Sequence, residues 1–190
     1  MRRQLITALK FLLAMTILTG LVYPLIMTGI AQVAFPTKSN GSLLVQNDKV
    51  IGSKLIGQKF DSISYFWSRP SAIGYNPVPS GASNYGPTSD TLRKLVEARR
   101  ELFGKMNSVK DLSSIPKEMI FASASGLDPH ITPAAALLQT DRISVARHFT
   151  AVQKAELLET IKKLTEPPQF LFLGEERINV LLLNIALDKI

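Results

Sequence analysis

The chain has 190 residues, of which 22 are Lys or Arg and 15 are Asp or Glu, so its formal net charge is +7. Hydrophobic residues make up 46% of the sequence, which excludes a disordered or low-complexity chain. Because cysteine is absent, a disulfide framework, a cysteine-ligated zinc site and a thiol nucleophile are also excluded. The length is typical of one ordinary domain, with room for an appendage.

The first 37 residues contain no acidic side chain, and they predict a membrane anchor. Arg2, Arg3 and Lys10 precede an uncharged apolar run over residues 11–35. Twenty-five helical residues span about 37 Å, and the hydrocarbon core needs about 20 residues. A cleaved signal peptide would have a shorter apolar region, of roughly 7–15 residues, and a small-x-small cleavage site. We therefore expect a retained single-span helix.

The charges that flank this span predict its orientation. Three basic side chains and the N-terminal amine precede it, and Lys38 is the only charge within ten residues after it. Positive residues beside a membrane helix stay in the cytoplasm. We therefore expect residues 1–10 in the cytoplasm of a bacterium, residues 11–35 in its inner membrane, and residues 36–190 as a periplasmic, extracytoplasmic domain.

Outside the predicted anchor, the charged residues are distributed as on an ordinary soluble surface. Residues 38–190 hold 19 basic and 15 acidic side chains, and the two signs are interspersed along the chain. This is the pattern of a solvated surface, whereas a nucleic-acid-binding face concentrates its basic residues. Nucleic acid is therefore not an expected partner.

Small and polar residues recur every four positions along the predicted membrane helix, at Thr16, Gly20, Pro24, Thr28 and Gln32. Each step of four advances about 40° around a helix, so the row is a slow spiral. Small residues let helix backbones approach closely in lipid, and Thr and Gln can hydrogen-bond across the interface. The spiral predicts contact with partner membrane helices, unless it is the ordinary composition of a single-pass helix. The proline is expected to kink the span.

The extramembrane part predicts an α+β domain in which several helices surround a small sheet. Apolar residues recur at three and four positions in the clearest helix, and Ser or Thr cap positions mark several helix starts. The expected elements, in chain order, are a hairpin over 43–51, a helix over 88–106, a strand over 119–123, a helix from Pro133 after a Thr132 cap, a helix over 150–164 after a capping box, a strand over 169–173 and a helix over 180–189 after an Asn179 cap.

Residues 60–87 follow neither a helical nor a strand period, although they hold the only tryptophan and three of the four tyrosines. A loop of over 20 residues is unusual in a compact domain and is often functional. Aromatic side chains are also the usual hot spots of interfaces. The segment predicts either a partner-binding surface or a loop whose rings are pinned to the core. Its candidate residues are Tyr65, Trp67, Arg69 and Asn84.

Asp128 and His130 are the strongest candidates for chemistry, because an Asp–His pair can transfer protons and two serines precede it. However, the chain lacks a Gly-x-Ser-x-Gly elbow, a helical pair of histidine ligands and a phosphate-binding loop. Both side chains could instead hydrogen-bond the turn that enters the helix at Pro133. We therefore expect no catalytic residue and no metal site. A membrane-anchored periplasmic enzyme that uses Asp128 and His130 is the alternative function.

Four blocks of this sequence resemble the C subunit of the bacterial Kdp potassium-transporting P-type ATPase. They are residues 65–72, which read YFWSRPSA, and residues 75–88, 123–136 and 177–188. With the N-terminal span and residues 52–58, the resemblance covers essentially the whole chain. Several long blocks in the right order are more specific than one short motif.

The resemblance implies a non-catalytic accessory subunit of an ATP-driven potassium transport complex in the membrane. The implied partners are the lipid bilayer, a potassium-translocating subunit, the P-type ATPase subunit that hydrolyses ATP, and a small single-span subunit. It also implies a part in assembly, and a role as a catalytic chaperone that raises the ATP affinity of the catalytic subunit.

The predicted orientation conflicts with direct contact to ATP, because it puts residues 36–190 across the membrane from the cytoplasm. We therefore expect no cofactor bound by this chain itself. ATP enters at the level of the complex, and potassium is the transported ion. A nucleotide-binding accessory domain is the weaker alternative.

Overall fold

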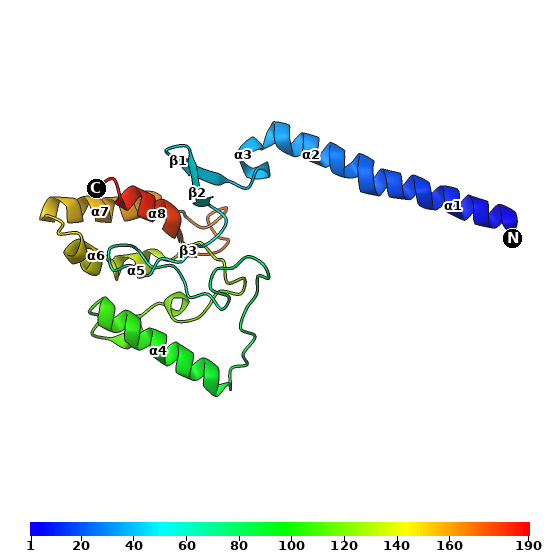
Figure 1. The fold of residues 1–190 in the computed structure, drawn as a ribbon. Helices are drawn as coiled ribbons and strands as arrows, with labels where there is room; N and C mark the ends of the chain where they lie inside the picture. Colours follow the sequence, from blue (N-terminus) through cyan, green and yellow to red (C-terminus); the bar gives the residue numbers. More distant parts are fainter. The chain divides into compact units, whose positions relative to one another are not determined.

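The computed structural model describes all 190 residues, which form two compact units, Met1–Ile51 and Gly52–Ile190 (Figure 1). The sequence predicted a division at residue 36, whereas this grouping places residues 36–51, with most of the first hairpin, in the same unit as the N-terminal helix. The fold mixes helices and short strands, as the sequence predicted.

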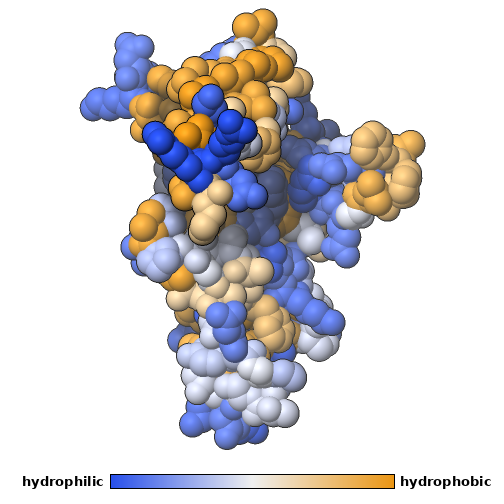
Figure 2. All heavy atoms as spheres, turned by 90° about the vertical axis from the view of Figure 1, so that its right-hand side faces the viewer, coloured by the Kyte–Doolittle hydropathy of each residue, from blue (hydrophilic) through white to orange (hydrophobic).

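The first unit is helical from Arg2 to Ala34 and has no buried residue along this length. It comprises α1 (Arg2–Ile17), a π-helical turn η1 (Leu18–Val22) and α2 (Tyr23–Ala34). The helix is long and apolar enough to cross a membrane. It begins nine residues before the uncharged run, and in Figure 2 orange apolar side chains cover it, with blue hydrophilic residues toward its N-terminal end.

The π-helical turn lies directly before Pro24, where the sequence predicted a kink. Proline has no N–H to donate, and its ring crowds the carbonyl four residues earlier, which belongs to Gly20. A π turn lengthens the spacing between hydrogen-bonding partners and relieves this crowding. The irregularity is therefore spread over Leu18–Val22.

The helix ends at Phe35, and a short helix α3 (Pro36–Ser39) leads to the predicted hairpin. The hairpin is present as β1 (Leu43–Gln46) and β2 (Lys49–Ser53). The two loop residues, Asn47 and Asp48, both have positive φ, at 49° and 58°. Asn and Asp tolerate this conformation, and a two-residue hairpin turn with two positive φ angles matches the twist of the strands.

Four helices of the second unit begin within two residues of the positions that the sequence predicted. In each case a side-chain oxygen accepts a hydrogen bond from the first turn, which is how an N-cap satisfies an otherwise free backbone donor. The helices, each after its cap, are α4 (Asp90–Met106) after Ser89, α5 (Pro133–Leu137) after Thr132, α7 (Ala151–Leu164) after Thr150 and α8 (Val180–Leu187) after Asn179. A further helix, α6 (Thr140–Ala146), follows α5.

Two predicted strands are wrong. Residues 119–123 are not a strand, because the 3₁₀ turn η3 (Lys117–Met119), which follows η2 (Leu112–Ser114), carries this run into the core. Residues 169–173 form a tight turn. A short apolar run forms a strand only if another strand is available to pair with it.

The sheet of the second unit is formed by residues that the sequence did not indicate. Strand β3 (His130–Ile131) pairs antiparallel with β4 (Ile178–Asn179), and His130 lies opposite Asn179. Two residues per strand are too few for a detectable alternation of apolar and polar side chains. The pair nevertheless joins the turn before α5 to the start of α8.

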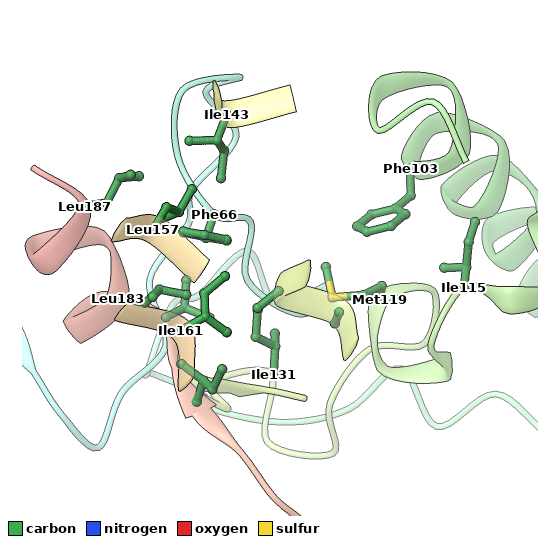
Figure 3. Close-up of a cluster of buried hydrophobic side chains, with 14 of the residues drawn as sticks. Phe66, Phe103, Ile115, Met119, Ile131, Ile143, Leu157, Ile161, Leu183 and Leu187 are labelled. Atoms are coloured by element: carbon green, nitrogen blue, oxygen red, sulfur yellow. The ribbon is translucent and has the colours of Figure 1, made fainter. Parts of the chain in front are cut away.

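The core is built around Phe66, which comes from the irregular segment 60–87 and is fully buried. Figure 3 shows its ring beside Leu157, with Ile161 and Leu183 close by, so α7 and α8 supply this side of the core. The side chain of Phe103 lies further along the same cluster and extends the core to α4.

Gly57 lies where two loops touch. Its N–H donates to the carbonyl of Leu127 at 2.6 Å, and a Cβ there would stand 2.6 Å from the carbonyl oxygen of Asp128. Gly57→Ala is therefore expected to lower the free energy of unfolding by about 1–3 kcal/mol, measured by thermal unfolding of the full chain in detergent. Gly81→Ala is the control, because a Cβ at Gly81 meets no atom within 4 Å. Equal losses would contradict the close approach.

Candidate functional site

The backbone of the aromatic segment is bound by side-chain amides. The Asn184 amide accepts from the N–H of Phe66 at 2.8 Å and donates to its carbonyl at 3.0 Å. The Gln139 amide makes the same pair with Trp67, at 2.7 and 3.5 Å. Buried peptide groups need such partners, and here two amides from the α6 and α8 region replace a neighbouring strand. The segment is therefore held in one conformation without belonging to a sheet.

Arg142 of α6 holds the same segment from a second direction, and its side chain is buried. The guanidinium carbon lies 4.6 Å from the centroid of the Trp67 ring, within cation–π range. Burial lowers the pKa of Arg142 to about 10. The guanidinium donates to oxygens of Asn107 at 2.9 Å, Gln139 at 2.9 Å, Ser62 at 3.3 Å, Tyr65 at 3.0 Å and Ile63.

Arg147 makes a parallel arrangement with Tyr65. Its guanidinium carbon lies 4.7 Å from the centroid of the tyrosine ring, and it donates to the carbonyl of Ser64 at 2.8 Å. It also forms an ion pair with Asp188 at 2.7 Å, and the Tyr65 hydroxyl donates to the same carboxylate at 3.2 Å. Tyr65 and Trp67, two candidates for partner binding, thus each contact an arginine of α6 or of its C-terminal end.

The structure brings Arg69 to Asp128 and His130, two neighbouring candidates that lie about 60 residues away in the sequence. The guanidinium of Arg69 forms an ion pair with Asp128 at 2.7 Å. The other carboxylate oxygen of Asp128 accepts from the backbone N–H of His130 at 3.0 Å and lies 3.4 Å from its Nδ1. Partial burial opposes ionisation of this carboxyl, but the bonds from His130 and Arg69 outweigh it and lower the pKa of Asp128.

This arrangement suits a structural role better than proton transfer. A carboxylate that is held ionised by a guanidinium is a weak general base. The hydroxyl oxygen of Ser125, one of the nearby serines, accepts a hydrogen bond from the N–H of Leu127 at 3.1 Å. The structure has no group of three or more His, Asp or Glu placed to hold a metal ion.

Two cavities lie along α4, and Arg99 lines both. One, of about 510 Å³, is lined by Asn84 and by the apolar side chain of Leu95. The other, of about 490 Å³, is lined by Trp67 and Tyr75. Asn84 is exposed and has a positive φ of 53°. Asn84, the fourth candidate residue of segment 60–87, therefore lines a cavity to which neither Arg69 nor Asp128 contributes.

Tyr75 and Arg99 are residues that sequence reasoning missed. The Tyr75 hydroxyl donates to the carbonyl of Arg69, and burial raises the pKa of Tyr75 to about 12. Arg99 donates to the carbonyl of Ile120 at 3.2 Å, and partial burial lowers its pKa. The partner of Tyr75 lies six residues earlier, inside an irregular segment without a period, and the partner of Arg99 lies 21 residues later, so no helical or strand pattern marks either residue.

The candidates in the N-terminal helix do not share one environment. Thr16, Gly20, Pro24 and Thr28 are exposed, and a Cβ at Gly20 would meet no atom within 4 Å. Gln32 differs, because its amide exchanges two hydrogen bonds with the amide of Asn40, at 3.1 and 3.2 Å. This pair ties the end of α2 to the end of α3.

The fold therefore defines a class of protein in which one candidate membrane-spanning helix precedes a small α+β domain. Residues 5–189 match the family model of the K⁺-transporting ATPase c chain, KdpC. The chain belongs to this family, as the sequence blocks indicated.

Relatives from several bacteria match over most of their length. The potassium-transporting ATPase KdpC subunit of Acidobacterium capsulatum is 47% identical over 185 residues, which cover 96% of each chain. That of Burkholderia orbicola is 48% identical over 178 residues, covering 92% of this chain and 90% of the relative. That of Geotalea uraniireducens is 44% identical over 192 residues, covering 99% and 98%.

The fork of donors on Arg142 suggests a direct test, because lysine keeps the charge but cannot reproduce that geometry. Arg142→Lys is expected to lower the free energy of unfolding by about 2–3 kcal/mol, followed through the fluorescence of Trp67, the only tryptophan. Arg93→Lys is the matched control, because Arg93 is exposed and pairs only with Asp90. An Arg142→Lys chain as stable as the control would show that the guanidinium does not hold the segment.

Proposed function

We propose that this chain is a non-catalytic accessory subunit that assembles and stabilises an ATP-driven potassium transport complex. The observation that carries the proposal is a 33-residue apolar helix without a buried residue. Such a helix needs lipid or partner helices around it, since water solvates its side chains poorly. The relatives are named as subunits of a potassium-transporting ATPase, which supports partner subunits in general. The proposed partners are a potassium-translocating subunit, a P-type catalytic subunit and a small single-span subunit, as the sequence resemblance implies.

The domain after the anchor is proposed to lie outside the cytoplasm. The support is the set of positive flanks, Arg2, Arg3 and Lys10, which precede the apolar run. In this orientation the domain cannot touch cytoplasmic ATP. A catalytic-chaperone effect on the ATP affinity of the catalytic subunit would then be indirect, and it would pass through the membrane helices.

The geometry favours this role over that of a periplasmic enzyme. An enzyme built on Asp128 and His130 needs a carboxylate or imidazole that is available to a substrate. Arg69 instead engages the carboxylate of Asp128, and the backbone N–H of His130 engages its second oxygen. These contacts join the aromatic segment to the turn before α5.

The spiral of small residues supplies a test of assembly. Gly20→Leu places a bulky side chain where close approach of a partner helix needs none, so the partner subunits that co-purify with the chain should fall about fivefold or more. Leu18→Ile is the control, since both side chains suit lipid. Unchanged co-purification with Gly20→Leu would remove the spiral from the interface.

Orientation can be tested independently of assembly. A reporter enzyme that is active only outside the cytoplasm, fused after Ile190, is expected to be active, and the same reporter fused after residues 1–10 alone is expected to be inactive. The reverse result would place the domain on the ATP side of the membrane. Direct nucleotide contact would then be the better account of any effect on ATP affinity.

A further inference from the structure

Four large apolar residues are exposed together at one tip of the second unit. The exposed fractions are 80% for Phe170, 88% for Leu171, 76% for Phe172 and 49% for Leu173. Single exposed apolar residues are normal on a protein surface, but a contiguous group usually marks an interaction site. We refer to residues 170–173 as the apolar tip.

The backbone conformation of the turn that carries the apolar tip does not favour the bulky residues found there. The backbones of Gln169 and Leu173 exchange two hydrogen bonds at 2.9 Å and close a loop of three residues. Phe170 and Leu171 have φ angles of +53° and +71°, a region that favours Gly or Asn over bulky side chains. An outlier of this kind points to function, because the side chains are kept despite the local strain.

The chain segments on either side of the apolar tip pair with each other and lie near the first residues of the second unit. The backbones of Glu166 and Arg177 exchange hydrogen bonds at 2.8 and 3.1 Å, and their side chains form an ion pair at 2.9 Å. Two residues later, the Asn179 amide donates to the carbonyl of Lys54 at 2.8 Å. Lys54 is the third residue of the second unit, and Leu55 beside it is 62% exposed.

The chain between the anchor and Lys54 is short. Nineteen residues separate Ala34 from Lys54, and α3 and the hairpin take up part of them. Even a fully extended segment of that length reaches only about 70 Å. If the anchor spans a membrane, Lys54 therefore stays within about 70 Å of the end of the anchor.

We propose that the apolar tip inserts into the interfacial layer of the lipid bilayer that holds the anchor. The domain then has a second attachment to the membrane, which restricts its rotation about the tether. Residues 167–174 carry no charge, which suits the acyl boundary, while Glu175 and Glu176 follow directly and would stay in the headgroup water. This inference rests on the anchor spanning a membrane and does not depend on the identity of the partner subunits.

The absence of cysteine allows a clean measurement on the full chain. Leu171→Cys, labelled with an environment-sensitive fluorophore, is compared in phosphatidylcholine nanodiscs with Val152→Cys on α7. Val152 is 76% exposed but is not part of the tip. Lipids with nitroxide groups on their acyl chains should quench the label at 171 about threefold or more relative to that at 152. Phosphatidylglycerol should weaken the quenching, because the flanking glutamates are repelled by anionic headgroups.

The outcomes distinguish whether lipid, water or a protein partner contacts the apolar tip. Equal quenching at 171 and 152 overturns the proposal. A label at 171 that stays in water on the lone chain, and becomes shielded only in the assembled complex, also overturns it and assigns the tip to a protein partner. A third label, at Leu21→Cys in the anchor, should be quenched strongly. If it is not, the anchor does not span the bilayer and this inference falls with that part of the proposed function.

Discussion

Buried peptide groups must be hydrogen-bonded, and in this domain side chains meet that requirement for a segment without strand partners. Asn184 binds the N–H and carbonyl of Phe66, Gln139 binds those of Trp67, and Arg142 donates to carbonyls of the residues before Phe66. Because these bonds hold the backbone, the Phe66 ring can occupy the centre of the core between α7 and α8. The packing of α7 and α8 therefore depends on the Phe66 ring, and the position of Phe66 depends on side chains from the helices.

The same constraint extends to the turn before α5. The aromatic segment continues into Arg69, which binds Asp128, and Gly57 passes the same turn closely enough to exclude a Cβ. The Tyr75 hydroxyl returns to the carbonyl of Arg69. The first part of this irregular region is thus held to the rest of the domain by side-chain hydrogen bonds and one ion pair.

This use of polar groups shapes what the protein can do. Asp128 and His130, which were the candidates for chemistry, join the aromatic segment to the turn before α5, and runs of exposed large apolar residues lie on the N-terminal helix and at residues 170–173. The chain belongs to the K⁺-transporting ATPase c chain family, and its relatives are named as subunits of a potassium-transporting ATPase.

The sequence by itself determined the elements whose rules are local. The apolar span, the Asn47-Asp48 turn and the caps Ser89, Thr150 and Asn179 follow from charge, backbone conformation and neighbours within four residues. The family resemblance likewise follows from blocks that are read in order along the chain.

Only the tertiary structure decided the roles of Arg142 and Arg99 and the pairing of β3 with β4. It also decided the conformation of residues 119–123 and 169–173. Arg142 contacts backbone 80 positions away, and 46 residues lie between β3 and β4. No local window contains both partners of such a contact. A short apolar run therefore becomes a strand, a buried 3₁₀ turn or an exposed tip according to what the distant chain brings beside it.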